Sequence, residues 1–543
     1  MNKKYAIAAL VVICAGAAGW FGVHTVERQT EQAVADALSS VSAQASEIRY
    51  SLLENRLTLK GVTYELSGDD VSRRGSLESV EVKGFNRKYV FTRSDAPYSP
   101  DALPLVADAI TAVGITDSTQ MDGVKVEQRV EKVQLTGWHQ RLGTLLALNE
   151  QHRGDASLFE ELYRCRIDAM EIDNVSMTLS EVDTPAVSVA VEGISFPDGV
   201  RAPRDGEKVA PVRVRFDGFH VSGRDFSGGL RKLEFYDVLA PDPEILAAFC
   251  QLFGAVDDLE DEEKRYLAEE RLISDIENLL LKNYENRVPV GRVLAEEGSF
   301  SLQDSPEETG AKPAVFSMAL KSFDYRLSLT EEGAIKDATK LSGLKMNFPD
   351  TMDEADILSR YAPEGLVLNM TSSSLIGDDV FSGSARYEME GLGELEGSLD
   401  LVGDIRALQR VVLEGDPSGE MNRLMQSVRL KGMNVVYRDS GFLPMSVEIA
   451  ARWSDSTVEN ELKEISALLQ KMAQEKERPV RECGAALYEQ LEHPGEFVMT
   501  IARERPMNFM EVITLASINP DALPVTLASK PGETALTDYL PKP

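Results

Sequence analysis

The five histidines are the first residues to examine for chemistry, because imidazole serves both as a general base and as a metal ligand. They are scattered along the chain, at His24, His139, His152, His220 and His493. No two of them have the HxH or HxxxH spacing that places two imidazoles on one metal ion. His220 and Ser222 share one face of a predicted strand, which is typical of its solvent side. The sequence therefore predicts no metal site.

Other catalytic patterns give no stronger signal. The chain has no GxSxG nucleophile motif, no P-loop and no strand-GxGxxG-helix motif for a nucleotide. Carboxylates are too numerous for any pair to be selected as a glycosidase pair. Trp138 and Trp453 could line a ligand groove, but core packing is their expected role. We therefore predict a non-enzymatic protein with no catalytic residue and no cofactor.

The cysteines and the longest acidic run are also expected to be structural. Cys14 lies in an apolar segment, and no CxxC motif joins Cys165, Cys250 or Cys483. Isolated buried thiols are the expected state, with one disulfide and a remaining thiol as the alternative. The run Asp257–Glu263 lacks the glycine and the spacing of an EF-hand, so it is expected to be solvated.

The charge balance excludes some partners. The chain of 543 residues has 89 Asp and Glu against 57 Lys and Arg, a formal net charge of −32. Repulsion from phosphate backbones argues against nucleic acid, and it argues against tight docking on anionic lipid headgroups. A hydrophobic content of 43% is typical of a globular protein, and the length indicates two to four domains.

The N-terminal residues are predicted to form a membrane anchor. Tyr5 to Val23 contains no charge, and its 19 residues would span roughly 28 Å as a helix. Lys3 and Lys4 precede it, which predicts a cytoplasmic N-terminus and a periplasmic body at a bacterial inner membrane. A cleaved signal peptide is the alternative, with Ala15-Gly16-Ala17 as its cleavage site.

Alternating apolar residues that end in glycine recur along the body and indicate strands. The glycines of the six copies are Gly61, Gly84, Gly137, Gly193, Gly218 and Gly432. An apolar residue follows each glycine directly, as in Leu57-Thr58-Leu59-Lys60-Gly61-Val62. We predict a bulge at the glycine that lets the strand bend while the apolar series stays on the buried face.

Segments whose apolar residues have helical spacing lie between these predicted strands. A heptad-like stripe, Val34, Leu38, Val41, Ala45 and Ile48, predicts a helix that packs on its own domain. Further helices are predicted at Asp101–Ile115, within Pro241–Leu281, and at Val458–Ala473, Cys483–Leu491 and Phe509–Ser517.

These patterns predict an α+β protein: an N-terminal transmembrane helix, then a long curved, mostly antiparallel β-sheet region with helical insertions and a helical C-terminal part. The expected divisions are a cytoplasmic tip (1–4), the anchor (5–23), a juxtamembrane helix (24–50), a β-rich domain (51–240), a helical insertion (241–287), a second β-rich region (288–455) and a helical C-terminal region (456–543).

The N-terminal 65 residues resemble two families of bacterial envelope proteins. Lys3, Lys4, Gly19, Trp20, Glu27, Glu31 and the strand at 48–59 resemble the YdgA-like proteins, and the glycine-ended strands resemble the AsmA-like proteins. The second resemblance implies a curved periplasmic sheet that handles lipid chains. The expected function is an envelope scaffold or assembly factor that binds other envelope proteins. Lipid binding or transfer in an apolar β-groove, and an enzyme with an unrecognised site, are the alternatives.

Overall fold

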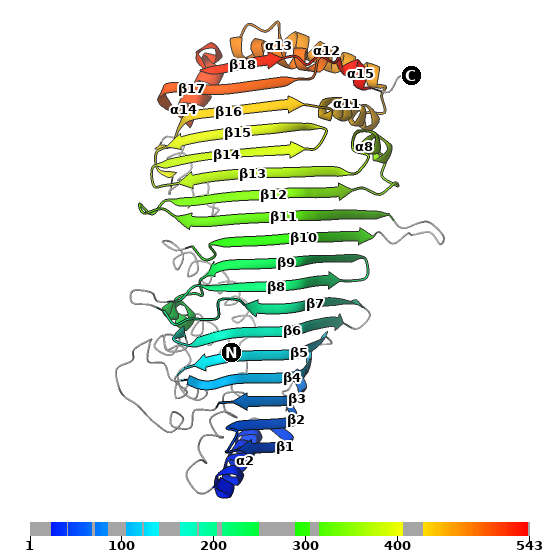
Figure 1. Cartoon of the computed structure of the whole chain (residues 1–543). Helices are drawn as coiled ribbons and strands as arrows, with labels where there is room; N and C mark the ends of the chain where they lie inside the picture. Colours follow the sequence, from blue (N-terminus) through cyan, green and yellow to red (C-terminus); the bar gives the residue numbers. More distant parts are fainter. Residues whose placement is uncertain are drawn as a thin grey trace, which may run out of the picture. The chain divides into compact units, whose positions relative to one another are not determined.

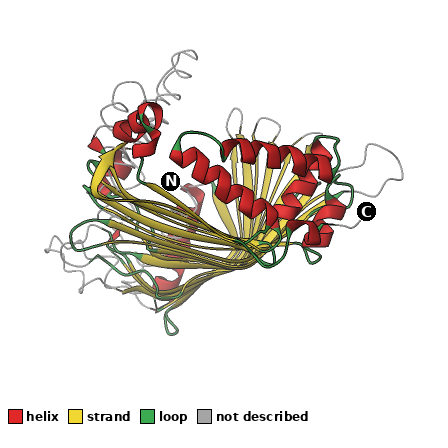
Figure 2. Ribbon diagram, turned by 90° about the horizontal axis from the view of Figure 1, so that it is seen from above, coloured by secondary structure: helices red, strands yellow, loops and turns green. Residues whose placement is uncertain are grey.

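A computed structural model gives the fold. It describes residues 23–40, 42–67, 71–84, 105–121, 124–140, 163–181, 184–203, 209–248, 288–303, 314–405 and 427–540. Strands account for 57% of these residues and helices for 23% (Figure 2). The chain divides into two compact units, residues 1–293 and residues 294–543.

The predicted fold class, α+β with an N-terminal transmembrane helix, is wrong, because the described chain is mainly antiparallel sheet. No helix within the described ranges is both long and apolar enough to cross a membrane. The prediction of a single-pass membrane protein is therefore corrected. Of the span predicted at Tyr5–Val23, only Val23 lies among the described residues, as the first residue of a helix.

Unit 1 is an antiparallel meander in which each strand pairs with the next along the chain (Figure 1). It begins with helix α2 (Val23–Ser40). The strands are β1 (Ala43–Ser51), β2 (Arg56–Ser67), β3 (Val71–Lys83), β4 (Leu105–Met121), β5 (Val124–His139), β6 (Arg166–Glu181), β7 (Thr184–Phe196), β8 (Val212–Ser222) and β9 (Phe226–Val238).

Unit 2 repeats this arrangement, with antiparallel pairing from β11 to β18. Its strands are β10 (Arg292–Gln303, which starts at the boundary), β11 (Val315–Leu329), β12 (Ile335–Asn347), β13 (Leu366–Ile376), β14 (Val380–Met389), β15 (Gly393–Val402), β16 (Arg429–Asp439), β17 (Glu496–Asn508) and β18 (Val525–Lys530). The helices are α8 (Ala355–Tyr361), α11 (Phe442–Trp453), α12 (Val458–Met472), α13 (Arg478–Glu492), α14 (Phe509–Ile518), η2 (Pro520–Ala522) and α15 (Leu536–Tyr539).

Helix α2 closes the first strands of unit 1. Val34 and Leu38 are buried in one core cluster with Leu57 and Leu59 of β2, so the predicted stripe does pack on its own domain. The helix ends at Ser40, however, and Ala45 and Ile48 of the stripe belong to β1, while Val41 lies outside the described residues. Glu27 and Glu31 of α2 accept hydrogen bonds from the backbone N–H groups of Leu52 and Tyr50, both at 3.0 Å. These carboxylates satisfy donors at the end of β1 and directly after it, which would otherwise be free to pair with another strand.

The glycine at the end of each apolar series changes which side chains face the core. In β2 the buried residues are Leu57 and Leu59 before Gly61, and Val62 and Tyr64 after it. The backbone at Gly61 has φ +53°, a left-handed conformation that favours glycine. The predicted return of the apolar series to the buried face is therefore confirmed at this strand.

The predicted bulge, with one extra residue in the strand that carries the glycine, is wrong for β2. The pairs Leu59–Val80 and Val62–Leu77 share one register, so β3 changes face at the same position as β2. Because both strands change face at the same position, their register is not shifted. Gly84, Gly137 and Gly218 have positive φ as well, whereas Gly193 and Gly432 do not.

This change of face explains why the spacing within Asp101–Ile115 predicts a helix, whereas the described residues from Leu105 onward form strand β4. Buried residues in β4 include Ala107 and Ile110, which are three residues apart. Gly114, with φ +65°, then separates the half-buried Ala112 from Ile115. A strand that changes face twice spaces its apolar residues by three as well as by two, which imitates helical periodicity.

The three predicted C-terminal helices are present as α12, α13 and α14. Thr457 caps α12, and Asn508 forms a capping box with Glu511 at the start of α14. Of the insertion predicted at 241–287, only a short helix at 243–248 falls within the described residues. The acidic run Asp257–Glu263 lies outside them.

Candidate functional site

The strands of unit 2 have one apolar and one polar face. Cross-strand pairs on the apolar face include Tyr387–Leu395 between β14 and β15 and Leu395–Tyr437 between β15 and β16. The neighbouring pair, Ala385–Gly397, is small. A Cβ added at Gly397 would have only the backbone oxygen of Asn434 within 4 Å, at 3.8 Å. The surface over these small residues is therefore not filled by other side chains.

Two closed clusters flank this open centre. At one end Leu399, Leu401 and Leu430 pack with Phe509 of α14. At the other end Leu366 and Met389 pack with residues of α8 and α11, which lie at the same strand ends in Figure 1. Between the clusters, Tyr387 and Leu395 are 41% and 43% exposed. We call the surface formed by Ala385, Tyr387, Leu395 and Gly397 the apolar centre.

The burial of the apolar face of unit 1 changes along the sheet. It is buried beneath α2 over the first strands and half-buried farther along. Directly paired residues on β5 to β8 continue the apolar series: Leu135–Met170, Val133–Ile172, Ile172–Ile194 and Ile194–Phe216. An apolar strip therefore crosses neighbouring strands rather than following one of them.

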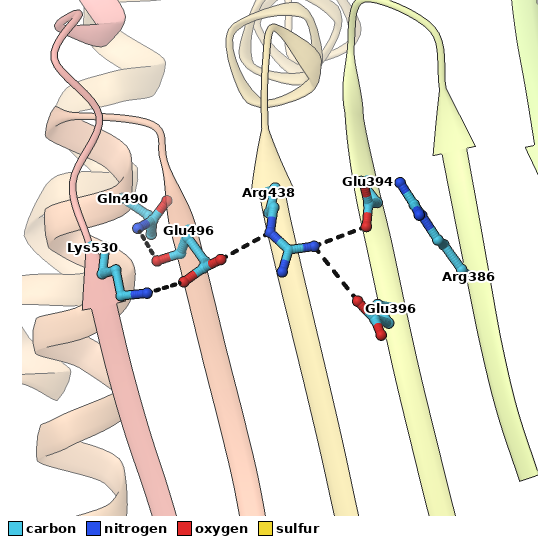
Figure 3. A network of polar contacts seen from close by, with 7 residues as sticks. All are labelled: Arg386, Glu394, Glu396, Arg438, Gln490, Glu496 and Lys530. Carbon is cyan, nitrogen blue, oxygen red and sulfur yellow. Dashed lines mark hydrogen bonds and ion pairs between the residues drawn. The ribbon is translucent and has the colours of Figure 1, made fainter.

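Charged residues form a ladder on the polar face of unit 2 (Figure 3). Glu394 accepts from Arg386 at 2.7 Å and from Arg438 at 2.8 Å, and Glu496 accepts from Arg438 at 2.8 Å and from Lys530 at 2.6 Å. Lys530 and Arg438 lower the pKa of Glu496. The side chains alternate in sign across five strands, and Glu396, which lies 3.6 Å from Arg438, adds a third carboxylate. Three carboxylates therefore balance the three cations of the ladder.

Arg438 in the middle of the ladder offers a test of its energetic weight. Because the Arg438 side chain is 43% exposed, water screens its ion pairs. We expect Arg438→Gln to lower the free energy of unfolding by no more than about 1 kcal/mol. Urea denaturation at low and high salt measures this, and a loss above about 2 kcal/mol would show that the ladder contributes substantially to stability.

Unit 1 contains a hydrogen-bonded pair of a buried tyrosine and a buried aspartate, Tyr64 and Asp117. Tyr64 of β2 donates to Asp117 of β4, and Arg73 of β3 binds the same carboxylate with two contacts of 3.0 Å. Burial raises the pKa of the Tyr64 hydroxyl, and the hydrogen bond to Asp117 raises it further. Tyr64 is therefore held protonated, which suits a structural donor and not a general base.

Glu234 of β9 is the most deeply buried charged side chain among the described residues, with no exposed surface. It accepts from Arg213 at 3.0 Å, Lys232 at 2.9 Å and Tyr236 at 2.6 Å. Burial by itself would raise the pKa of Glu234, but the hydrogen bonds from Tyr236, Lys232 and Arg213 outweigh it and lower the pKa to about 2. Every contact is internal, so Glu234 has a structural role.

The residues that the sequence singled out for chemistry are not brought together. His220 is exposed on β8, and it lies with Ser222 on the polar face, opposite Ala190 and Ser188. Trp138 packs against the core, as predicted. Trp453 is 75% exposed, so its predicted core role is wrong.

The cysteines and acidic groups likewise form no centre that the structure describes. Cys165 and Cys483 are free thiols, while Cys14 and Cys250 fall in stretches outside the described ranges. Burial raises the pKa of the Cys165 thiol to about 11, which makes it a poor nucleophile. Within the described residues, no group of three or more His, Cys, Asp or Glu side chains could hold a metal ion.

Sequence reasoning did not identify the apolar centre as a site. Leu395 lies in the predicted second β-rich region (288–455), but its exposure depends on which helices cover the sheet. A family model described as "Uncharacterized protein" matches residues 376–530, which include the apolar centre. No curated protein matches the chain.

Proposed function

We propose that this chain is a non-enzymatic protein that binds the acyl chains of lipids on its apolar sheet face. The observation that carries the proposal is the exposure of Tyr387 and Leu395 between two closed core clusters. The exposed apolar side chains stand beside small residues, Ala385 and Gly397. Covering this surface with a hydrocarbon chain is favourable because it removes the apolar groups from water. The resemblance to AsmA-like proteins leads to the same expectation.

The half-buried strip of unit 1 suits the same kind of ligand. Neighbouring strands lie ~4.8 Å apart, so a chain that crosses β5 to β8 would run over roughly 14 Å of sheet. A flexible hydrocarbon matches such a strip because it needs no hydrogen bonds. A bacterial envelope location is part of this proposal, and protease accessibility of the body in spheroplasts is its separate test.

The expected result is that lipids co-purify with the chain and that Leu395→Asp weakens binding of a fluorescent fatty acid at least tenfold. A carboxylate in the apolar centre would have to lose its hydration beneath the acyl chain, which is costly. Ser398→Asp is the matched control, because it places the same charge on the polar face of the same strand. Fluorescence titration of the full chain measures both variants.

The alternative is a scaffold that binds another envelope protein on this face. It would be favoured if no lipid appears by mass spectrometry and the fatty acid does not bind with saturation. Equal loss of binding in Leu395→Asp and Ser398→Asp would also contradict the proposed position of the ligand.

A further inference from the structure

A cavity of about 880 Å³ lies over the first six strands of unit 1. Its lining includes a row of directly paired residues, each on the next strand: Thr63, Ser76, Thr116, Arg129 and Ser176. These residues alternate with the buried apolar ones, as Thr63 does between Val62 and Tyr64. The cavity therefore belongs mainly to the polar face and is separate from the apolar strip.

Short hydroxyl side chains give this row its chemistry. Ser76 Oγ and Thr116 Oγ1 are 2.8 Å apart and hydrogen-bonded to each other. Ser118 and Thr178 line the same cavity on the adjoining row. Each hydroxyl can both donate and accept, so together they match a ligand that carries several hydroxyl groups of its own. Strands hold them in place, which lowers the entropy lost on binding.

Two arginines and one carboxylate in the cavity differ from the other charged groups there, because these three lack partners among the residues that the structure describes. Asp117 is neutralised by Arg73, and Glu127 forms an ion pair with Lys125. Arg74 and Arg129 have neither an ion-pair nor a side-chain hydrogen-bond partner within the described part of the chain. Glu65, which is paired in register with Arg74 on the neighbouring strand, also has no ion-pair or side-chain hydrogen-bond partner among the described residues.

Unpaired guanidinium groups in one cavity are notable in a chain with a net charge of −32, because carboxylate partners are plentiful. Elsewhere Arg166, Arg215 and Arg326 pair with aspartates close to them in sequence. Arginine binds phosphate well because its planar fork can donate two parallel hydrogen bonds.

We propose that this cavity binds a single phosphate group attached to a hydroxylated carbon skeleton, with the phosphate on Arg74 and Arg129 and the hydroxyls on the Ser/Thr row. The skeleton is a glycerol or sugar phosphate, which exists both as a free metabolite and as a lipid headgroup.

A neighbouring cavity limits the ligand to low negative charge. This second cavity, of about 590 Å³, shares Arg129 and Ser176 with the first. Its lining includes Glu78, Glu131 and Glu192. These carboxylates would repel a second phosphate, so polyphosphates and nucleic acids are selected against. This local arrangement also reconciles binding of one phosphate with an acidic chain that repels polyanionic surfaces.

Titration calorimetry of the full chain with glycerol 3-phosphate tests the proposal. We expect saturable binding, and at least tenfold weaker binding for both Arg74→Gln and Arg129→Gln. Arg429→Gln is the matched control, because Arg429 of β16 also has no ion-pair partner among the described residues and does not line the cavity. It should bind like the unaltered chain.

Vesicles of phosphatidylcholine, with and without phosphatidylglycerol, distinguish the two sources of the phosphate. Binding that needs phosphatidylglycerol and is lost in Arg74→Gln and Arg129→Gln assigns a lipid headgroup, whereas binding of glycerol 3-phosphate alone assigns a free metabolite. The proposal is overturned if neither probe binds, if glycerol binds as tightly as glycerol 3-phosphate, or if Arg429→Gln is equally impaired.

The proposed acyl-chain site is independent of this cavity. Failure of the acyl-chain proposal can therefore be distinguished from failure of the phosphate proposal. Fatty-acid binding should be unchanged in Arg129→Gln, and glycerol 3-phosphate binding should be unchanged in Leu395→Asp.

Discussion

Replacing Gly137 by Val is expected to lower the free energy of unfolding of unit 1 by about 3 kcal/mol. Gly137 has φ +61°, a conformation that a β-branched residue adopts only with strain. An added Cβ would also lie 2.0 Å from Oδ2 of Asp168, so the Asp168 side chain would have to move. The aspartate can rotate, but the backbone strain remains. Urea denaturation followed by circular dichroism measures the change.

Gly193→Val is the matched control, from the same predicted motif. Gly193 lacks a positive φ, and an added Cβ would meet only Cβ of Asp217, at 3.9 Å. Valine favours strands, so the free energy of unfolding should stay within about 0.5 kcal/mol of the starting value or rise slightly. Equal losses in the two variants would mean that the left-handed backbone is not the cause.

Replacing Glu234 by Gln is expected to cost about 3 kcal/mol at neutral pH. The amide keeps the shape of the side chain but removes the negative charge that balances Arg213 and Lys232. Those cations would then remain beside a neutral buried group.

The pH dependence gives this prediction a second measurement. The folded pKa of Glu234 is about 2, below the ordinary value of 4.5. Its stabilising contribution is therefore fully present above about pH 4.5 and is lost as the pH falls toward 2. The difference in stability between the unaltered chain and Glu234→Gln should shrink over this window.

Glu396→Gln serves as the control, because Glu396 is half-exposed and its contact with Arg438 is long, at 3.6 Å. Its loss should be below about 1 kcal/mol. A constant gap between Glu234→Gln and the unaltered chain from pH 7 to pH 2 would contradict the assigned role of the Glu234 charge.

Local periodicity predicted much of the secondary structure and much less of the candidate site. Alternation located β2 and β5, and helical spacing located α12 to α14, because these patterns depend on which side of a single element is buried. The same reasoning failed in β4, where two changes of face within one strand imitate a helix. It also failed at Trp453, whose exposure depends on where the neighbouring helices end.

Contacts between strands could not be derived in this way. Arg74 and Arg129 line one cavity although 54 other residues separate them in the sequence. Leu395 meets Tyr387 and Tyr437 only because β14, β15 and β16 pair in one register. A shift of one residue would move each of these side chains to the opposite face.

The sequence by itself therefore determined which residues alternate, where glycine permits a change of face, and that the chain is strongly acidic. Only the tertiary structure decided that neighbouring strands change face together, that Tyr387 and Leu395 stay exposed, and that Arg74 and Arg129 lack carboxylate partners among the described residues. The physical reason is that alternation is a property of one strand, whereas register and coverage arise from the packing of segments that are distant in the sequence.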